Sequence, residues 1–152
     1  MTEPHRVVFD TNVFVSATLS KSLTSPTREL LARWEREEFV LVTCEALVTE
    51  LIEKLLEYHV QPASIALLVA SLARLAEWVT VHDEEVIPVL ADPDDDIVLA
   101  CAVSGRANYI VTYDPHFDVL HGVYRTIQIV KALPFLWTVR GDQPPEVDAK
   151  ST

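Results

Sequence analysis

The chain has 152 residues, of which 49% are hydrophobic and 23% charged, a balance typical of one globular domain with a sizeable core. Its 12 basic and 23 acidic residues give a formal net charge of −11, which argues against a broad electrostatic surface for nucleic acid, although bound metal ions would change the local sign. The three glycines form neither a G-x-x-x-x-G-K nor a G-x-G-x-x-G loop, which excludes nucleotide binding of those two kinds.

Strands and helices are predicted to alternate along the chain, because short apolar runs alternate with apolar residues at helical spacing. A helix start is indicated at Ser25-Pro26, a helix cap at Thr43 and a helix end at Gly105. The stretch 16–24 is polar, and we expect it to be flexible. The predicted strands are approximately 6–9, 39–42, 78–81, 109–112 and 126–130, and the predicted helices are approximately 26–37, 44–58, 63–76, 92–104 and 133–139.

This alternation predicts the α/β fold class, as a three-layer α/β/α sandwich with a central, mostly parallel sheet. Neither a linker nor an internal repeat divides the sequence, so we expect one domain over residues 1–140 and a disordered tail over residues 141–152. We recognise no signal peptide, and the apolar stretch 65–76 is too short to cross a membrane. We therefore expect a soluble cytoplasmic protein without membrane contact.

Cysteine and histidine residues give little sign of a site. Cys44 and Cys101 are far apart in the sequence and lack the spacing of a zinc or thioredoxin-type motif. Cys101 lies in an apolar stretch, and we expect a small core residue there. The five histidines are scattered over turns and element ends; His116 lies closest to a candidate site residue, and a surface position is its simpler interpretation.

Two predicted strands are followed by an aspartate. Asp10 directly follows the first strand, and Asp114 follows the strand that ends at Thr112. Ligand sites in open α/β sheets form at the carboxyl ends of strands, so we expect the two carboxylates to converge on one crevice. Thr112 projects to the same side as Asp114 and could hydrogen-bond a phosphate or a metal-bound water. Taken singly, each aspartate is also an ordinary turn residue.

The run from Asp92 to Asp96 contains four carboxylates in five positions. Helix capping explains Asp92 and one neighbouring carboxylate. The four carboxylates together repel one another unless a cation lies among them. A calcium loop is excluded, because Ile97 and Val103 occupy the positions of its required Gly and Glu. We select Asp96 as the functional member, since it directly precedes the apolar face of the predicted helix.

Glu50 lies beside the apolar face of its predicted helix, and an ion pair with Lys54 is the simpler interpretation of that position. Oxygen ligands without cysteine or histidine favour magnesium or manganese over zinc. Such sites bind the ion with carboxylates, waters and phosphate oxygens of the substrate.

These pieces together resemble a PIN-domain protein over roughly residues 6–139. The acidic run from Asp92 resembles a bacterial and archaeal branch described as toxins of toxin–antitoxin systems. The gap of 18 residues from Asp96 to Asp114 (114 − 96) also fits the family. The matching pieces are Val8-Phe9-Asp10-Thr11-Asn12, Thr43 through Glu50, Asp96 at the start of its helix, and Thr112-Tyr113-Asp114.

The resemblance implies a PIN-like nuclease domain that hydrolyses RNA phosphodiester bonds with Mg²⁺ or Mn²⁺. It implies RNA as substrate and, for the toxin branch, a small antitoxin protein as partner. The apolar helix over 63–76 could be core or the surface of a homodimer. The family's catalytic and metal-binding residues correspond to Asp10, Glu50, Asp96 and Asp114, with Asn12 and Thr112 as supporting polar residues.

The sequence departs from the family at two places. Tyr113 stands where a glycine is common, and it could narrow the mouth of the site or stack on a base. The additional carboxylates of Asp94 and Asp95 leave open whether one of them shares the metal-ligand role with Asp96.

Three further hypotheses remain open. Contacts to an RNA backbone are assigned to Lys21, Arg28 and Arg106, against the simpler interpretation of solvated surface charge. A haloacid-dehalogenase-like phosphatase also begins with a strand-end aspartate, but it needs a second aspartate where this chain has Asn12. A non-catalytic module that binds RNA or protein is disfavoured, because all four carboxylates are present.

Overall fold

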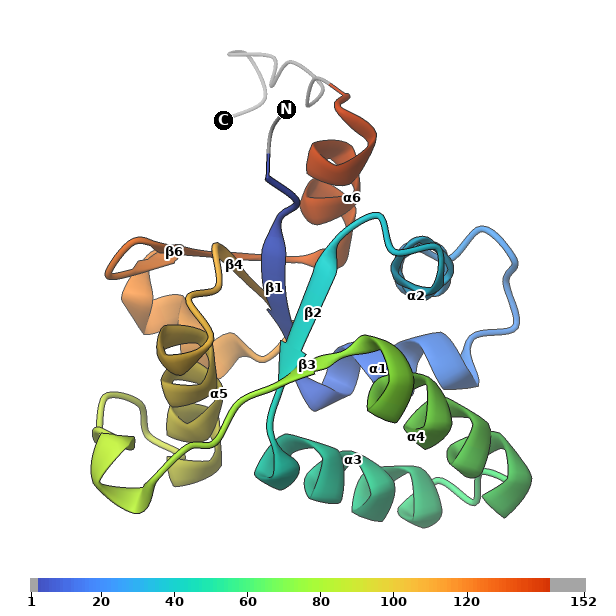
Figure 1. Ribbon diagram of the computed structural model, residues 1–152, viewed down its shortest axis with the longest axis horizontal. Helices are drawn as coiled ribbons and strands as arrows, with labels where there is room; N and C mark the ends of the chain where they lie inside the picture. The colour runs from blue at the N-terminus through green and yellow to red at the C-terminus, as the bar shows by residue number, and fades with distance from the viewer. Residues whose placement is uncertain (1–2, 143–152) are drawn as a thin grey trace.

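The structure is a computed structural model that describes residues 3–142, so the predicted tail lies outside the described residues except for its first two positions. In this part of the chain a sheet of six strands has the order β3-β2-β1-β4-β6-β5 (Figure 1). The pairs joining β1, β2, β3, β4 and β6 are parallel, whereas β5 is antiparallel to β6. The strands are β1 (Arg6–Phe9), β2 (Val40–Thr43), β3 (Glu77–Trp78), β4 (Tyr109–Val111), β5 (Val123–Tyr124) and β6 (Ile127–Val130).

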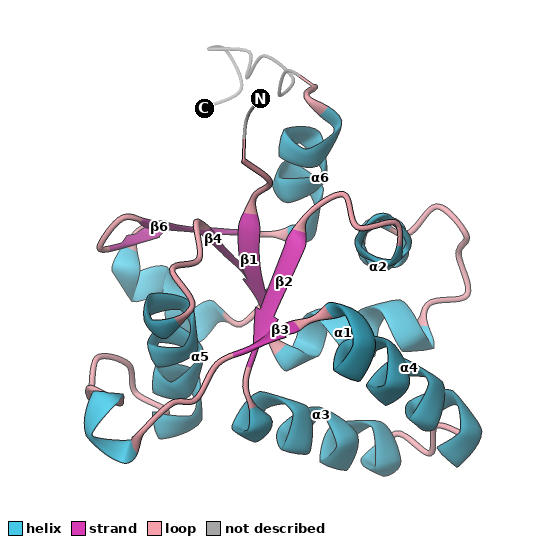
Figure 2. Ribbon diagram, in the orientation of Figure 1, coloured by secondary structure: helices cyan, strands magenta, loops and turns pink. Residues whose placement is uncertain are grey.

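Helices cover both faces of the sheet, as Figure 2 shows. Their apolar stripes pack on the central strands, and this two-sided cover explains why β1 is a continuous apolar run rather than an alternating one. The predicted α/β class with a mostly parallel sheet is confirmed. The helices are α1 (Thr11–Leu19), α2 (Pro26–Glu35), α3 (Glu45–Glu57), α4 (Pro62–Leu75), α5 (Pro93–Ser104) and α6 (Ala132–Arg140), with 3₁₀ turns η1 (Asp83–Glu85) and η2 (Pro115–Leu120).

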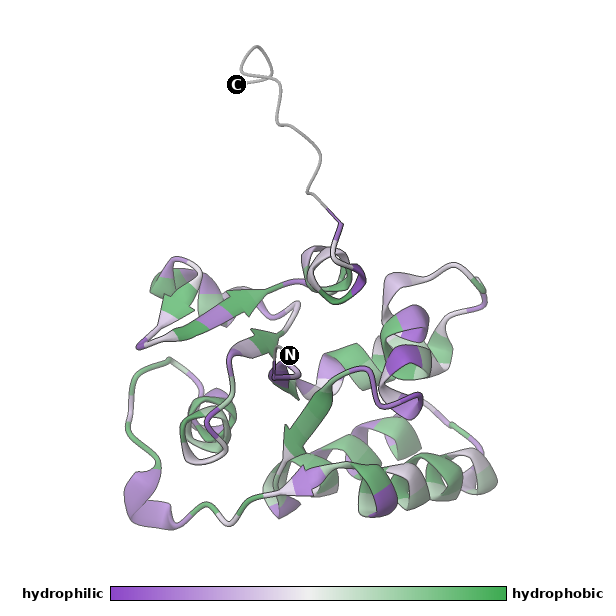
Figure 3. Cartoon of the chain, turned by 45° about the horizontal axis from the view of Figure 1, so that its top comes forward, coloured by the Kyte–Doolittle hydropathy of each residue, from purple (hydrophilic) through white to green (hydrophobic). Residues whose placement is uncertain are grey.

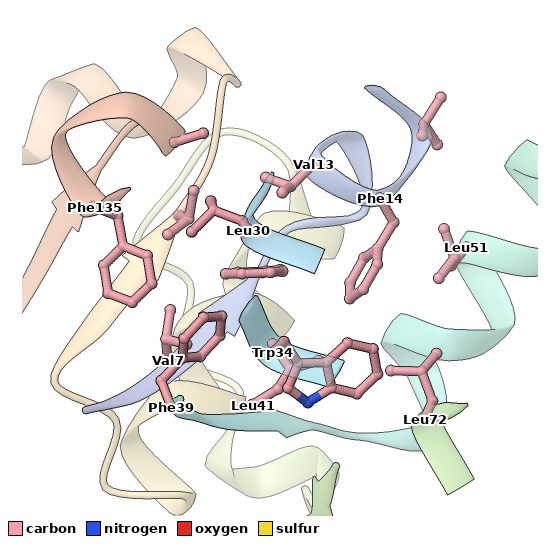
Figure 4. Close-up of a cluster of buried hydrophobic side chains, with 14 of the residues drawn as sticks. Val7, Val13, Phe14, Leu30, Trp34, Phe39, Leu41, Leu51, Leu72 and Phe135 are labelled. Carbon is pink, nitrogen blue, oxygen red and sulfur yellow. The ribbon is translucent and has the colours of Figure 1, made fainter. Parts of the chain in front are cut away.

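Each face of the sheet has its own hydrophobic core. On one face, Trp34 of α2 and Phe135 of α6 lie among side chains of β1, β2 and α1 (Figure 4). The Phe39 and Phe135 rings meet edge to face with centroids 5.3 Å apart, a favourable aromatic geometry. On the other face, α5 packs against Val8 and Ile110. Apolar residues therefore concentrate along the strands, whereas η1 is hydrophilic (Figure 3).

Several local predictions need correction. The stretch expected to be flexible is helical over residues 16–19, because α1 continues to Leu19 with Val13 and Phe14 buried against the sheet. Thr43 belongs to β2, and Cys44 takes the N-cap position of α3. The strand expected over 78–81 is the two-residue β3, while β5 and the 3₁₀ turns had no clear sequence signal. None of the described helices is long and apolar enough to span a membrane.

The two cysteines, which are far apart in the sequence, both belong to the core on the α5 face of the sheet. Cys101 is fully buried, as predicted for a small core residue, and Cys44 is buried as well. The neighbouring Cys101 thiol and the amides at the start of α3 lower the pKa of Cys44. The pair joins the end of β2 to α5, so it is part of the second core.

Candidate metal centre

Asp10 is fixed at the carboxyl end of β1 by hydrogen bonds to both of its oxygens. It is the N-cap of α1, and its Oδ1 accepts a 2.8 Å bond from the amide of Thr11. Its Oδ2 accepts a 2.7 Å bond from the hydroxyl of Thr112. The side chain is only 5% exposed, so the carboxylate has one defined orientation at the edge of the sheet.

Thr112 links the two strand-end aspartates. Because β4 pairs in parallel with β1, Phe9 stands opposite Val111 and the residues that follow them emerge side by side. The Thr112 hydroxyl donates to Asp10 and accepts a 3.0 Å bond from the amide of Asp114. Asp114 then caps η2 by accepting a bond from the amide of His116 at 2.9 Å.

A third carboxylate joins them from the first turn of α5. Asp10, Asp95 and Asp114 each offer a carboxylate oxygen, and these three atoms lie within 4.8 Å of one another. Asp95 is 6% exposed, and its Oδ2 lies 2.9 Å from Nδ1 of His116. Three elements distant in sequence therefore bring their carboxylates to one point, near the carboxyl ends of β1 and β4.

Asp96, the residue selected from the sequence, points elsewhere. Its Oδ1 accepts bonds from the amides of Val89 at 3.1 Å and Leu90 at 2.8 Å, and its side chain is buried. Successive residues on a helix are rotated by about 100°, so the two adjacent aspartates project in different directions. The structure brings Asp95 to the other two aspartates, and Asp96 holds the segment before α5 against the helix.

Glu50 lies outside the group of three aspartates. Its Oε1 is 3.0 Å from Nζ of Lys54, which is the ion pair named as the simpler interpretation of this position. Lys54 also donates to the hydroxyl of Thr11 at 3.2 Å, directly beside Asp10. Asn12 accepts a 3.4 Å bond from the amide of Tyr113 and so joins the segments that follow β1 and β4.

Burial makes two carboxylates of this group, those of Asp95 and Asp10, harder to ionise. It raises the pKa of Asp95 to about 6; the bond from His116 opposes this shift, and the negative charges of Asp114 and Asp10 add to it. Burial also raises the pKa of Asp10, against the hydrogen bonds from Thr112 and Thr11. Negative charges held together in a site of low dielectric are stabilised by a cation.

His116 is the residue near the site that the sequence reasoning undervalued. Its ring is half exposed, yet Nδ1 contacts Asp95 at 2.9 Å and Asp114 at 3.4 Å. The bond to Asp95 raises the pKa of the imidazole, and the charge of Asp114 reinforces the shift. His116 also forms a second group of close ligand atoms with Asp92 and Asp95. Its position two residues after Asp114 was the available sequence signal.

The three basic residues assigned to RNA contacts do not gather at the aspartates. Lys21 follows the end of α1 that is remote from Asp10. Arg28 donates a 3.5 Å bond to the carbonyl of Ser20, between α1 and α2. Arg106 precedes β4 and lines a hollow at the opposite end of the strands.

The comparisons with known proteins agree with this architecture. A family model described as a PIN domain matches residues 6–116, a segment that contains all three grouped aspartates as well as Glu50 and Lys54. No curated protein shows a significant match to the sequence. Since the family match covers well over half of its length, the chain belongs to the PIN domain family.

Proposed function

We propose that this chain is a metal-dependent ribonuclease that hydrolyses phosphodiester bonds. PIN domains are generally nucleases, and they generally use a divalent metal. The observation that carries the proposal is the convergence of Asp10, Asp95 and Asp114 from β1, α5 and β4 on one point. A purely structural role would not require three carboxylates there, because their mutual repulsion destabilises the folded chain.

The donor set fits magnesium or manganese. Asp10, Asp95 and Asp114 supply oxygen ligands, which these hard cations prefer, and the group contains no thiolate. A divalent ion bound there would activate a water molecule and neutralise charge that develops on the scissile phosphate. His116 is positioned to hold Asp95 through its Oδ2, which leaves the other carboxylate oxygen for a ligand.

The protein residues around this group have separate tasks in the proposed reaction. The Thr112 hydroxyl holds Asp10 and the Asp114 backbone in register, so that the carboxylates need not reorganise when a ligand binds. Asp114 is the least buried of the three, which suits an acceptor for a proton of the attacking water. Tyr113 is 40% exposed beside it and offers a ring on which a nucleotide base can stack.

Single-stranded RNA is the substrate class that we propose. The net charge of −11 leaves no broad electrostatic attraction for a duplex, so binding must depend on local contacts at the site. A stacked base and a phosphate held at the carboxylates are such contacts. A flexible single strand can present both to the same site.

Cleavage of a short end-labelled single-stranded RNA tests the proposal. We expect products in Mn²⁺ or Mg²⁺, none in excess EDTA, and a loss of at least a hundredfold in rate for Asp10→Asn and Asp114→Asn. Asp83→Asn, which changes an exposed carboxylate of η1, is the matched control and should cleave like the unaltered protein. Absence of cleavage, together with absence of Mn²⁺ binding with and without RNA, would instead favour the non-catalytic binding module.

The toxin role extends this proposal to a biological setting. A hollow of about 500 Å³ between α3 and α5 is lined by Glu45, Glu50, Glu53 and Asp94, so a basic protein segment would complement it. Expression of the chain alone should then slow bacterial growth, and Asp10→Asn should relieve this effect. Normal growth during expression of a chain that cleaves RNA in vitro would separate the toxin role from the nuclease activity.

A further inference from the structure

We infer that the ammonium group of Lys54 takes the place of a second divalent cation, so that this site binds one metal ion and uses Lys54 as its other positive charge. The inference rests on the proposed metal-dependent nuclease. It assigns Lys54 a positioning role at the carboxylates, and it predicts the metal stoichiometry of the site.

The contacts of Lys54 set it apart from an ordinary surface lysine. Its Nζ lies 3.0 Å from Oε1 of Glu50 and donates to Thr11 Oγ1 at 3.2 Å. Thr11 is buried, and its amide donates to Asp10. A helical i,i+4 pair explains the contact with Glu50 but does not explain the second bond, which directs the ammonium from α3 across to the start of α1.

Charge explains why this position matters. The Lys54 ammonium lies between the carboxylate of Glu50 and the hydroxyl of Thr11, whose amide donates to Asp10, so it brings a positive charge close to both acidic groups. In sites with two metal ions, the ions lie about 3.5–4 Å apart, and they need ligands that bridge or flank both of them. In this chain Glu50, the fourth carboxylate of the region, is already paired with the ammonium group of Lys54.

The side chain also has the properties that such a role needs. Lys54 is 40% exposed, and an ammonium on a flexible four-carbon stem can move to a phosphate oxygen when substrate arrives. In the absence of substrate it limits repulsion between Glu50 and the neighbouring aspartates. Lys54 therefore brings its positive charge from α3 to the start of α1, beside the residue that bonds Asp10.

The test counts Mn²⁺ ions by calorimetric titration of the full chain and compares Lys54→Met with Lys54→Arg. We expect one ion in the unaltered protein. Lys54→Met should bind its first ion about tenfold more tightly, because a charge that repels Mn²⁺ across several ångströms is removed, and it should accept a second ion. Lys54→Arg should retain one ion at nearly unaltered affinity. Arg74→Met, which removes a positive charge from an exposed position on α4, is the matched control and should change neither number nor affinity.

Two outcomes overturn the inference in distinguishable ways. Two ions in the unaltered protein, or an unchanged affinity in Lys54→Met, would refute the role of Lys54 and leave the nuclease proposal intact. Absence of Mn²⁺ binding in the unaltered protein and in both variants, with RNA present, would refute the proposed function as well. Thermal unfolding in EDTA shows whether each variant is folded, so a loss of binding cannot be mistaken for a loss of structure.

Discussion

Replacing Asp95 with asparagine should make the metal-free protein more stable while removing its response to metal. The substitution keeps the size of the side chain and an oxygen that can accept from His116. Burial, with smaller contributions from Asp114 and Asp10, raises the pKa of Asp95 from 3.8 to about 6. Because this carboxylate ionises more easily in the unfolded chain than in the folded chain, its ionised form at neutral pH lowers the stability of the folded state.

The magnitude follows from the shift in pKa. A rise of about two units corresponds to about 3 kcal/mol at neutral pH, since each unit represents about 1.4 kcal/mol. This value is an upper limit, because asparagine must still find partners for its amide group. We expect metal-free Asp95→Asn to be more stable than the unaltered protein by about 1–3 kcal/mol.

Urea unfolding at about pH 7.5, in EDTA and then in Mn²⁺, measures both effects. Ligand at a hundred times its dissociation constant stabilises a folded protein by about 2.7 kcal/mol, so Mn²⁺ should stabilise the unaltered chain and leave Asp95→Asn unchanged. Asp96→Asn is the matched control. It keeps an oxygen for the amides of Val89 and Leu90, and it should still respond to Mn²⁺. A loss of the Mn²⁺ response in Asp96→Asn, with a normal response in Asp95→Asn, would refute the reasoning.

Three further substitutions probe the surroundings of the site and the fold. Thr112→Val removes the hydroxyl that donates to Asp10, so it should destabilise the chain by about 1–3 kcal/mol in urea unfolding and weaken Mn²⁺ binding in calorimetry. Glu29→Gln breaks the ion pairs that lower the pKa of Glu29, chiefly the one with Arg140. It should lower stability by about 0.5–1 kcal/mol at neutral pH, and the difference should vanish as the pH falls below the usual value of 4.5, because the pairs stabilise only the ionised carboxylate. Gly105→Ala would push a Cβ into a side chain of β2 and should destabilise the fold by about 1–3 kcal/mol, as measured by thermal unfolding.

The strand-end aspartates show how far the sequence alone leads. The alternation of apolar runs and helical patterns predicts a parallel sheet, and the carboxyl ends of parallel strands share one edge. That rule alone predicts that Asp10 and Asp114 lie near each other. The parallel pairing of β1 with β4 brings the two residues together. The hydroxyl of Thr112 between them follows from the same alternation of side chains along β4.

The third aspartate depends on information that the sequence does not contain. α5 is buried nearly all round, so its apolar residues do not mark which side faces the sheet edge. Asp95 and Asp96 are therefore equivalent in the pattern, and only the rotation of the packed helix separates them. The ion pair between Lys54 and Glu50 could be expected from their i,i+4 spacing along α3. The bond from Lys54 to Thr11 could not, because it depends on how α3 packs against α1.

Diffraction from crystals soaked in Mn²⁺ tests the central claim most directly, because the anomalous signal of manganese locates the ion. The proposal predicts one peak within coordinating distance of Asp10, Asp95 and Asp114, and no peak in crystals of Asp95→Asn. A peak confined to Asp92 and His116, or no peak in crystals that also contain a short single-stranded RNA, would contradict it.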